Sequence, residues 1–297
     1  MKHIKYFLIA IIGIFAISCS NDNTASTMGT LSLELTDAPM HYDQFTSASV
    51  TIEKVEIGNS QNANSFMTLT ATPMTYNLLE LVNGMTSNMA NAEIPSGDYD
   101  LMRLYISSTE MDMLNGDSFT YNMNQDGYSG SGMIQNGMML NNQNRSIDFQ
   151  LNHPLTISNG TMSEFLLDID VDQSFVLEDV AYDNNMMMNM SGFTFKPTMR
   201  FVDMATSGTI SGTVQDAHGN LPNATVSIMQ NGILYTSTHS NANGNYALIG
   251  IPEDAYTIKT ELDGYIMNPI GNEQNMGKMN MMSEATLNVD FNMMASD

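Results

Sequence analysis

Apolar and polar residues alternate along most of the chain after Gly29. This period-two pattern predicts strands with one buried face, because successive side chains of a strand point to opposite sides of the sheet. The clearest segments are Gly29–Leu35, Val50–Ile57, Ile147–Leu151, Phe165–Val171 and Phe193–Phe195. Only Tyr76–Val82 has a pattern that a helix would share, and it is short. The sequence therefore predicts an all-β protein.

Two segments carry a more detailed prediction. In Val50–Ile57 the apolar phase shifts near Glu53, as one inserted residue would cause, and this predicts a β-bulge. Tyr99–Ile106 is apolar on both faces apart from Arg103, which predicts a central strand that is covered on both sides.

A second series of short strand patterns begins after Asp203–Ser207 and continues to Phe291. Turn signals such as His218-Gly219-Asn220 separate these strands by about 8–12 residues, a spacing typical of an antiparallel sandwich. The stretch Gly271–Ser283 lacks a strand pattern and predicts a long loop. We expect two consecutive antiparallel β-sandwich domains, at residues 29–204 and 207–294.

The N-terminus has the pattern of a bacterial lipoprotein signal peptide. Lys2 and Lys5 precede an apolar run, Tyr6–Ile17, that is shorter than the roughly 20 helical residues needed to cross a bilayer. The run ends in Ala16-Ile17-Ser18-Cys19, which resembles a lipobox, and Cys19 is the only cysteine. We expect residues 1–18 to be the signal peptide and residues 19–28 a lipidated cysteine, bearing diacylglycerol and palmitate, with a flexible tether. The alternative is a plain secretory signal with an incidental cysteine.

The chain is strongly acidic, with 32 Asp and Glu residues against 9 Lys and Arg and a formal charge of −23. A nucleic acid partner would require a clustered basic face, whereas the cations here are scattered. Anionic membrane surfaces and anionic polysaccharides would be repelled. Lipid on Cys19 would therefore hold the protein in the bacterial cell envelope, at the outer membrane or cell surface.

Methionine is unusually frequent, at 29 residues, and tryptophan is absent. The densest clusters are Met186–Met190, Met279–Met282 and Met293–Met294. Thioethers bind soft Cu(I), so a copper site is one hypothesis. The other is that methionine replaces leucine as a flexible filler of β cores and loops. Copper sites usually add His or Cys, and the histidines are remote from these clusters in sequence.

Asp168, Asp170 and Asp172 are expected on one face of the Phe165–Val171 strand, about 6.5–7 Å apart. Three carboxylates in a row are a candidate Ca²⁺ site, although the spacing does not fit an EF-hand loop. A solvated acidic face explains them equally well. Asp37, before Pro39, is expected to accept backbone N–H groups in a turn.

No catalytic motif is present. The nearest match to a serine nucleophile elbow, Gly127–Ser131, lacks the final glycine, and the metalloprotease, redox and phosphate-binding motifs are absent. Paired carboxylates for glycoside hydrolysis stay open, because many acids are available. We expect a protein without catalytic residues and without a required cofactor.

The C-terminal block resembles the carboxypeptidase regulatory-like, transthyretin-like sandwich family. The matching segments are Gly208–Val214, Gly219–Val226, Asn243–Tyr246 and Ile251–Ile258, and Tyr246 and Tyr256 are expected to plug the sandwich. The resemblance implies an accessory module with a carbohydrate-binding-like fold and no catalytic residues.

The N-terminal block resembles the domain of unknown function 4382, a family of bacterial envelope lipoproteins. The matching segments are Gly29–Pro39, Val50–Ile57, Leu78–Gly84, Ile94–Tyr99, Leu167–Phe175 and Phe195–Pro197. This resemblance implies a β-rich fold at the cell surface and no reaction.

Together these patterns predict a non-catalytic envelope lipoprotein that presents a binding surface. Carbohydrate is the favoured ligand, and a neutral glycan would suit the acidic chain. The alternatives are a structural or adhesive component that binds another envelope protein, and a Ca or Cu binding protein. Ligand-binding residues are not fixed by the sequence, but exposed aromatic candidates are Tyr128 and Tyr265.

Overall fold

The computed structural model describes residues 27–38, 44–123, 133–134, 138–141, 146–267 and 278–296. The predictions for the signal peptide, Cys19 and the tether up to residue 26 lie outside these residues, as does Tyr128. The described chain is built almost entirely of strands, as predicted. Among its helices, none is long and apolar enough to span a membrane.

One sheet of the N-terminal half has four strands, and the chain enters it first. Its order is β16 (Met199–Asp203), β11 (Met162–Asp170), β1 (Met28–Ala38) and β5 (Ser87–Pro95). β1 pairs with β11 in parallel, whereas its pairing with β5 is antiparallel. The expectation of purely antiparallel sheets is therefore wrong at this pair.

The second sheet of this half has eight strands. Its main path is β3 (Asn62–Thr70), β2 (Phe45–Asn59), β6 (Gly97–Met113), β10 (Ser146–Ile157), β9 (Met138–Asn141) and β8 (Met133–Ile134), with β4 (Met74–Asn77) on β2 and β7 (Ser118–Asn122) on β6. The pairing of β2 with β6 shifts register on both sides of Ile52, and Glu53 has no opposite residue on β6, which confirms the predicted bulge.

Strand β6 is central, as predicted, but only one of its faces is fully buried. Met102, Leu104 and Ile106 point into the core, whereas Arg103 and Tyr105 on the other face are half-buried. The outer face of β6 is therefore lined by long side chains and not by a second layer.

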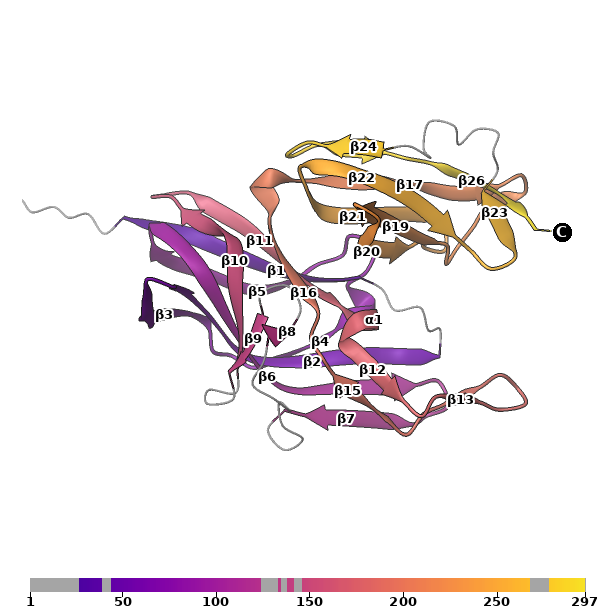
Figure 1. Ribbon diagram of the computed structural model, residues 1–297, viewed down its shortest axis with the longest axis horizontal. Coiled ribbons are helices and arrows are strands. Elements are labelled where there is room, and N and C mark those ends of the chain that lie inside the picture. The colour runs from indigo at the N-terminus through magenta and orange to yellow at the C-terminus, as the bar shows by residue number, and fades with distance from the viewer. Residues whose placement is uncertain are drawn as a thin grey trace, which may run out of the picture.

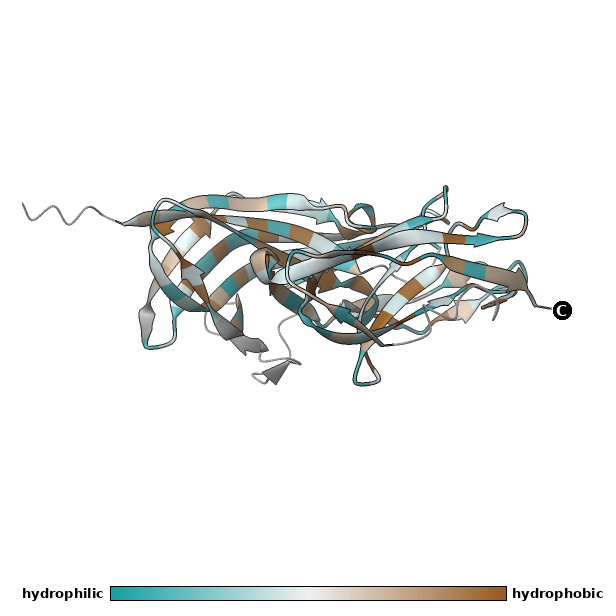
Figure 2. Ribbon diagram, turned by 90° about the horizontal axis from the view of Figure 1, so that it is seen from above, coloured by the Kyte–Doolittle hydropathy of each residue, from teal (hydrophilic) through white to brown (hydrophobic). Residues whose placement is uncertain are grey.

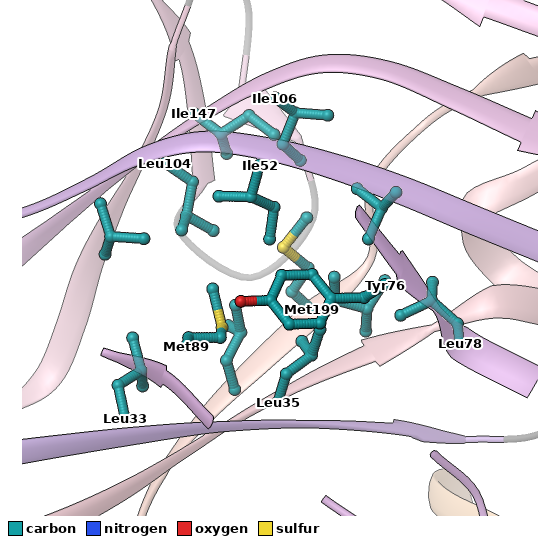
Figure 3. Close-up of a cluster of buried hydrophobic side chains, with 14 of the residues drawn as sticks. Leu33, Leu35, Ile52, Tyr76, Leu78, Met89, Leu104, Ile106, Ile147 and Met199 are labelled. Atoms are coloured by element: carbon teal, nitrogen blue, oxygen red, sulfur yellow. The ribbon is translucent and has the colours of Figure 1, made fainter. Parts of the chain in front are cut away.

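The core of the N-terminal half lies between the two sheets (Figure 3). Leu31, Leu33 and Leu35 from β1 are fully buried, as their alternation predicts. They face apolar residues of the eight-stranded sheet, such as Ile52 and Leu104. Alternating apolar and polar bands along the strands are visible in Figure 2. The segment Tyr76–Val82 forms the end of β4 and a single 3-10 turn, η1 (Leu78–Glu80), instead of a helix.

A β-hairpin arm extends from the end of β11. A one-turn helix, α1 (Val171–Ser174), leads into it, and the arm comprises β12 (Phe175–Glu178), β13 (Ala181–Tyr182), β14 (Met188–Asn189) and β15 (Gly192–Phe195). β12 pairs with β15, and β13 pairs with β14 nearer the tip. In Figure 1 the loop beyond β13 projects from the body of the molecule.

The C-terminal half has a hydrophobic core of its own, reached from β16 through η2 (Met204–Thr206). One sheet comprises β17 (Ser207–Asp216), β18 (Gly219–Asn220), β21 (Asn245–Pro252), β23 (Tyr265–Met267), β25 (Thr286–Asn288) and β26 (Phe291–Ala295). The other comprises β20 (Ile233–His239), β19 (Thr225–Gln230), β22 (Asp254–Glu261) and β24 (Lys278–Met281).

Three features of this half bear on the predictions. Tyr246 and Tyr256 are buried in the core, as expected. β17 pairs in parallel with β25 and β26, so this sandwich is also mixed. Part of the expected loop, Lys278–Met281, is a strand that pairs with β22, because Met281 alternates into the core.

A candidate binding site at the domain junction

The outer face of the four-stranded sheet lies against the C-terminal half, whose strands β20 and β21 approach it (Figure 1). β1, β11 and β16 supply this face through residues that alternate with the core positions. The polar side of β1 and β11, which the pattern predicts to be solvated, is thus partly covered by the second half of the chain. This junction holds the most deeply buried charges of the described residues.

Asp168 and Arg200 form an ion pair at the centre of the junction. They are direct neighbours on β11 and β16, and Arg200 Nε donates to Asp168 Oδ2 over 2.5 Å. Asp168 is 3% exposed. Burial lowers the pKa of Arg200, but Asp168 and Tyr235 together more than offset this effect, and the net pKa is raised. The guanidinium of Arg200 therefore stays charged at any physiological pH.

Arg200 also contacts the C-terminal half directly. Its Nη1 donates to the carbonyl of Gly250 over 2.8 Å, and its Cζ lies 4.8 Å from the ring centroid of Tyr235. A guanidinium can bind carboxylate, carbonyl and ring at once because its donors are fixed in one plane. One side chain thus links β11, β16, β20 and β21.

Two further contacts hold the N-terminal and C-terminal halves against each other. Asn83 Oδ1, in the loop after η1, accepts from the backbone N–H of Ala247 over 2.6 Å. Gly250 has a φ of +64°, and a Cβ on it would lie 2.8 Å from Leu166 Cδ2. Only glycine fits this combination of a left-handed backbone and close approach. Backbone of the C-terminal half therefore packs directly on β11.

Asp37 lies at the end of β1, next to this ion pair. Its Oδ1 accepts from the backbone N–H of Val171 over 3.1 Å, so the predicted backbone acceptor role is correct, but the donor is a distant element and not a local turn. Burial, reinforced by the Asp168 carboxylate, raises the pKa of Asp37 well above its ordinary value. Asp37 Oδ2 and Asp168 Oδ1 accept no hydrogen bond from the described part of the chain.

The residues of this charged cluster line a small cavity of about 10 Å³, which is near the lower limit for one water molecule. Thr36, Thr236 and Thr238 contribute to its walls. The cavity is far too small for an organic ligand. Its role is therefore electrostatic and structural.

A larger cleft, of about 340 Å³, lies elsewhere along the same junction. Ser163 and Glu164 of β11 form one wall, Asp203 and Met204 lie at the connection between the halves, and Glu284 faces them from the C-terminal half. Glu284 is held there with a φ of +58°, and its backbone N–H donates to the Ser207 carbonyl over 2.8 Å. Ligand sites occur preferentially at such junctions and have volumes of about 300–1,000 Å³.

The three carboxylates of the candidate Ca²⁺ site are placed in different environments. Asp168 is paired with Arg200, Asp170 Oδ1 caps α1 by accepting from Gln173, and Asp172 is exposed on α1. They do not share one strand face, because β11 ends at Asp170. In the described ranges no three His, Cys, Asp or Glu side chains are grouped so as to hold a metal ion. Calcium binding stays a prediction.

The methionine clusters are divided between core and solvent. Met293 is buried and Met294 exposed on β26, and Met188 is buried while Met186 is exposed on the arm. Alternation along β26 separates its two adjacent thioethers, whereas Met186 lies in the turn between β13 and β14. Other methionines, such as Met102, Met111 and Met199, are core residues. This arrangement matches the filler hypothesis in the described chain, and copper binding is left untested.

Aromatic side chains offer little free ring surface. On the outer face of the eight-stranded sheet, Arg103 lies 3.9 Å from the ring centroid of Phe66 and Lys54 lies 4.0 Å from that of Tyr105. Tyr265 is half-buried and packs against the C-terminal core. Among the described aromatic residues only Tyr182 is largely exposed. The described surface therefore offers few aromatic rings on which a sugar could stack.

The sequence did not single out Arg200, Asn83 or Glu284. Their importance depends on contacts between the two halves, and the residues that make these contacts lie 50 or more positions apart along the chain. The signals that could have drawn attention to them are a lone arginine on an apolar strand and the Asn83-Gly84 turn.

Residues 28–197 match the model of the domain of unknown function DUF4382. The chain belongs to this family. Residues 209–271 match the carboxypeptidase regulatory-like domain, so this DUF4382 protein has both domains in the predicted order. The family assignment gives no reaction.

No curated protein matches this DUF4382 chain. Solved structures with weak similarity include the Bacillus anthracis TIE protein (13% identity, TM-score 0.24, 91% of this chain and 51% of that one). The shaft pilin SpaA of Lactobacillus rhamnosus GG is also similar (10% identity, TM-score 0.23, 91% and 99%). The chain thus spans about half of the first of these proteins. Such TM-scores are too low to inform its function.

Proposed function

We propose that this DUF4382 protein is a non-catalytic lipoprotein of the bacterial cell envelope that binds a neutral glycan in the junction cleft. The observation that carries the proposal is the cleft itself, which is of ligand size and is lined by both domains. The match to a carboxypeptidase regulatory-like domain supports a binding role.

The polar groups of the cleft suit sugar hydroxyls. Glu164 and Glu284 are exposed carboxylates that make no hydrogen bond to the described part of the chain, and Ser163 and Thr156 add hydroxyl groups nearby. Carboxylates accept hydrogen bonds from hydroxyl donors strongly. The same carboxylates repel anionic sugars, which leaves neutral glycans as ligands.

The environment of these carboxylates favours binding over hydrolysis. A general acid for glycoside cleavage is kept protonated by apolar burial. Glu164 and Glu284 are exposed, and Asp203 Oδ1 is occupied by the backbone N–H of Ala205 over 2.9 Å. The cleft therefore supplies acceptors for a ligand but no buried proton donor.

The anchoring part of the proposal rests on the sequence around Cys19. Lipid would attach the mature protein to the membrane, and the acidic fold would stay clear of anionic headgroups. Cys19→Ser should release soluble protein or leave an uncleaved precursor. Unchanged processing and membrane partitioning of this variant would refute lipidation.

Binding is tested with the lipid-free residues 20–297 on an array of neutral, amino and anionic glycans. We expect signals for neutral glycans that fall at least tenfold in Glu284→Gln. The matched control is Glu53→Gln, an exposed glutamate in the bulge of the other sheet, which should bind as wild type does. No glycan signal, or equal binding by Glu284→Gln, would refute the proposal.

A further inference from the structure

The hairpin arm, residues 175–195, carries a concentrated set of exposed apolar side chains. Val176, Val180, Tyr182 and Met186 are 40%, 41%, 59% and 81% exposed. Single exposed apolar residues are normal on a protein surface, but four of them on one projecting element indicate a contact surface. Figure 1 shows the arm projecting from the N-terminal domain, below the C-terminal strands and toward the same end of the molecule.

The tip of the arm is held in one conformation. Asp183 Oδ1 accepts from the backbone N–H groups of Asn185 and Met187, over 2.8 and 2.9 Å. The Met186 backbone N–H donates to the Asp183 carbonyl, and Met186 has a φ of +61°. A methionine in this left-handed region is sterically disfavoured, and here it presents its side chain to solvent.

The base of the arm is anchored in the domain core. Phe175 and Phe195 face each other across the strand pair with ring centroids 5.1 Å apart, and Phe193 packs beside them. Met188, on the tip side, is 1% exposed and belongs to the same core. Because both ends are fixed, the exposed side chains are presented without the ordering penalty of a flexible loop.

The charges of the arm select the kind of partner. Residues 175–195 include Glu178, Asp179 and Asp183 but no Lys or Arg. A second copy of this chain would bring the same three carboxylates and a net charge of −23 against them. Like-charge contacts of this kind are unfavourable, whereas a surface with basic residues around an apolar pocket is complementary.

We infer that the arm is a docking element for another protein, whose apolar pocket receives Met186 and Tyr182 and whose rim supplies Lys or Arg to the three carboxylates. Methionine adapts to irregular apolar pockets, and tyrosine is enriched among the residues that dominate binding energy. This interaction is independent of glycan binding in the junction cleft.

The test uses the full-length protein in its own bacterium with a photo-crosslinking amino acid at position 182. We expect one adduct with a distinct protein, identified by mass spectrometry. Met186→Gly should abolish the adduct while leaving the fold intact, because glycine accepts the left-handed backbone. The control, Ile233→Ser, removes a side chain that is 73% exposed on a hairpin of the other domain and should not change the adduct.

The affinity between this protein and the purified partner identified from the adduct then distinguishes the outcomes. We expect Kd to rise at least tenfold in Met186→Gly. The Kd of the wild-type protein should also rise between 50 and 500 mM NaCl, because salt screens surface charge pairs. An adduct between two copies of this chain, an adduct unaffected by Met186→Gly, or no adduct would each overturn it.

Discussion

Asp37 is the residue whose surroundings most clearly oppose its charge. Burial and the Asp168 carboxylate raise its pKa well above the ordinary value. Asp170 is affected in the same direction, and burial raises its pKa to about 6. The folded protein therefore holds protons that the unfolded chain, with a pKa of about 3.9 for Asp, has already lost. Stability should fall as the pH rises from about 4 through these folded-state pKa values.

Asp37→Asn tests this electrostatic penalty. Asparagine keeps the oxygen that accepts from Val171 but cannot ionise. The variant should therefore melt about 3 °C or more above wild type at pH 8, which corresponds to an increase of about 1 kcal/mol in the free energy of unfolding. The difference should shrink toward pH 5. Melting temperatures from pH 5 to 8 measure it, with the exposed Asp263→Asn as control. A lower melting temperature for Asp37→Asn at pH 8 would show that the ionised carboxylate stabilises the fold.

Gly250 is the second residue on which the junction depends. Gly250→Ala should destabilise the protein by about 2–4 kcal/mol, since it combines a left-handed alanine with overpacking against Leu166. Gly264→Ala is the matched control, because its φ is +76° but no atom lies within 4 Å of the added Cβ. Chemical denaturation should therefore separate the two variants. Equal destabilisation would mean that the close approach of the domains contributes nothing.

At the scale of elements, the end of β11 decides where its carboxylates lie. The strand stops at Asp170, whose side chain caps α1, and the chain turns into the arm. Alternation alone extends the strand to Val171 and places three aspartates on one face. The ion pair with Arg200 and the cap are contacts that no local pattern contains, which is why this face differs from the expectation.

The calcium prediction from those three aspartates is directly measurable. A site would raise the melting temperature, by about 2.7 kcal/mol of stability at a hundredfold excess over Kd. Mg²⁺ and NaCl at matched ionic strength control for general screening of the acidic chain. Asp172→Asn should remove a specific Ca²⁺ effect. A Ca²⁺ response no larger than that of Mg²⁺ eliminates the site.

At the scale of the whole molecule, local burial patterns were sufficient for much of the fold. The core leucines of β1, the bulge in β2 and the buried Tyr246 follow from alternation and size. The parallel pairing of β1 with β11 was not predicted, because it joins segments more than 100 residues apart. The junction cleft was not predicted for the same reason. Glu164 and Glu284 are brought together only by the packing of the two domains, and no local pattern sets them apart from other acidic residues.

Independent folding of the two halves is also a prediction at this scale. Each half has its own hydrophobic core, and Ala205 and Thr206 between them are exposed. Limited proteolysis should cleave near residues 203–207, and a fragment of residues 207–294 should unfold cooperatively at a lower temperature than the whole chain. The lower temperature follows from loss of the Arg200 and Asn83 contacts. A fragment without a cooperative transition would contradict two separate domains.

The central claim is that one glycan contacts both walls of the junction cleft. The most direct measurement is a double-mutant cycle in which calorimetric titration with a neutral oligosaccharide compares wild type, Glu164→Gln, Glu284→Gln and the double variant. Residues that bind one ligand together are coupled, so we expect an interaction energy of at least about 0.5 kcal/mol between these two glutamates of different domains. Additive effects, or affinities unchanged by either substitution, would contradict a shared glycan site at the junction.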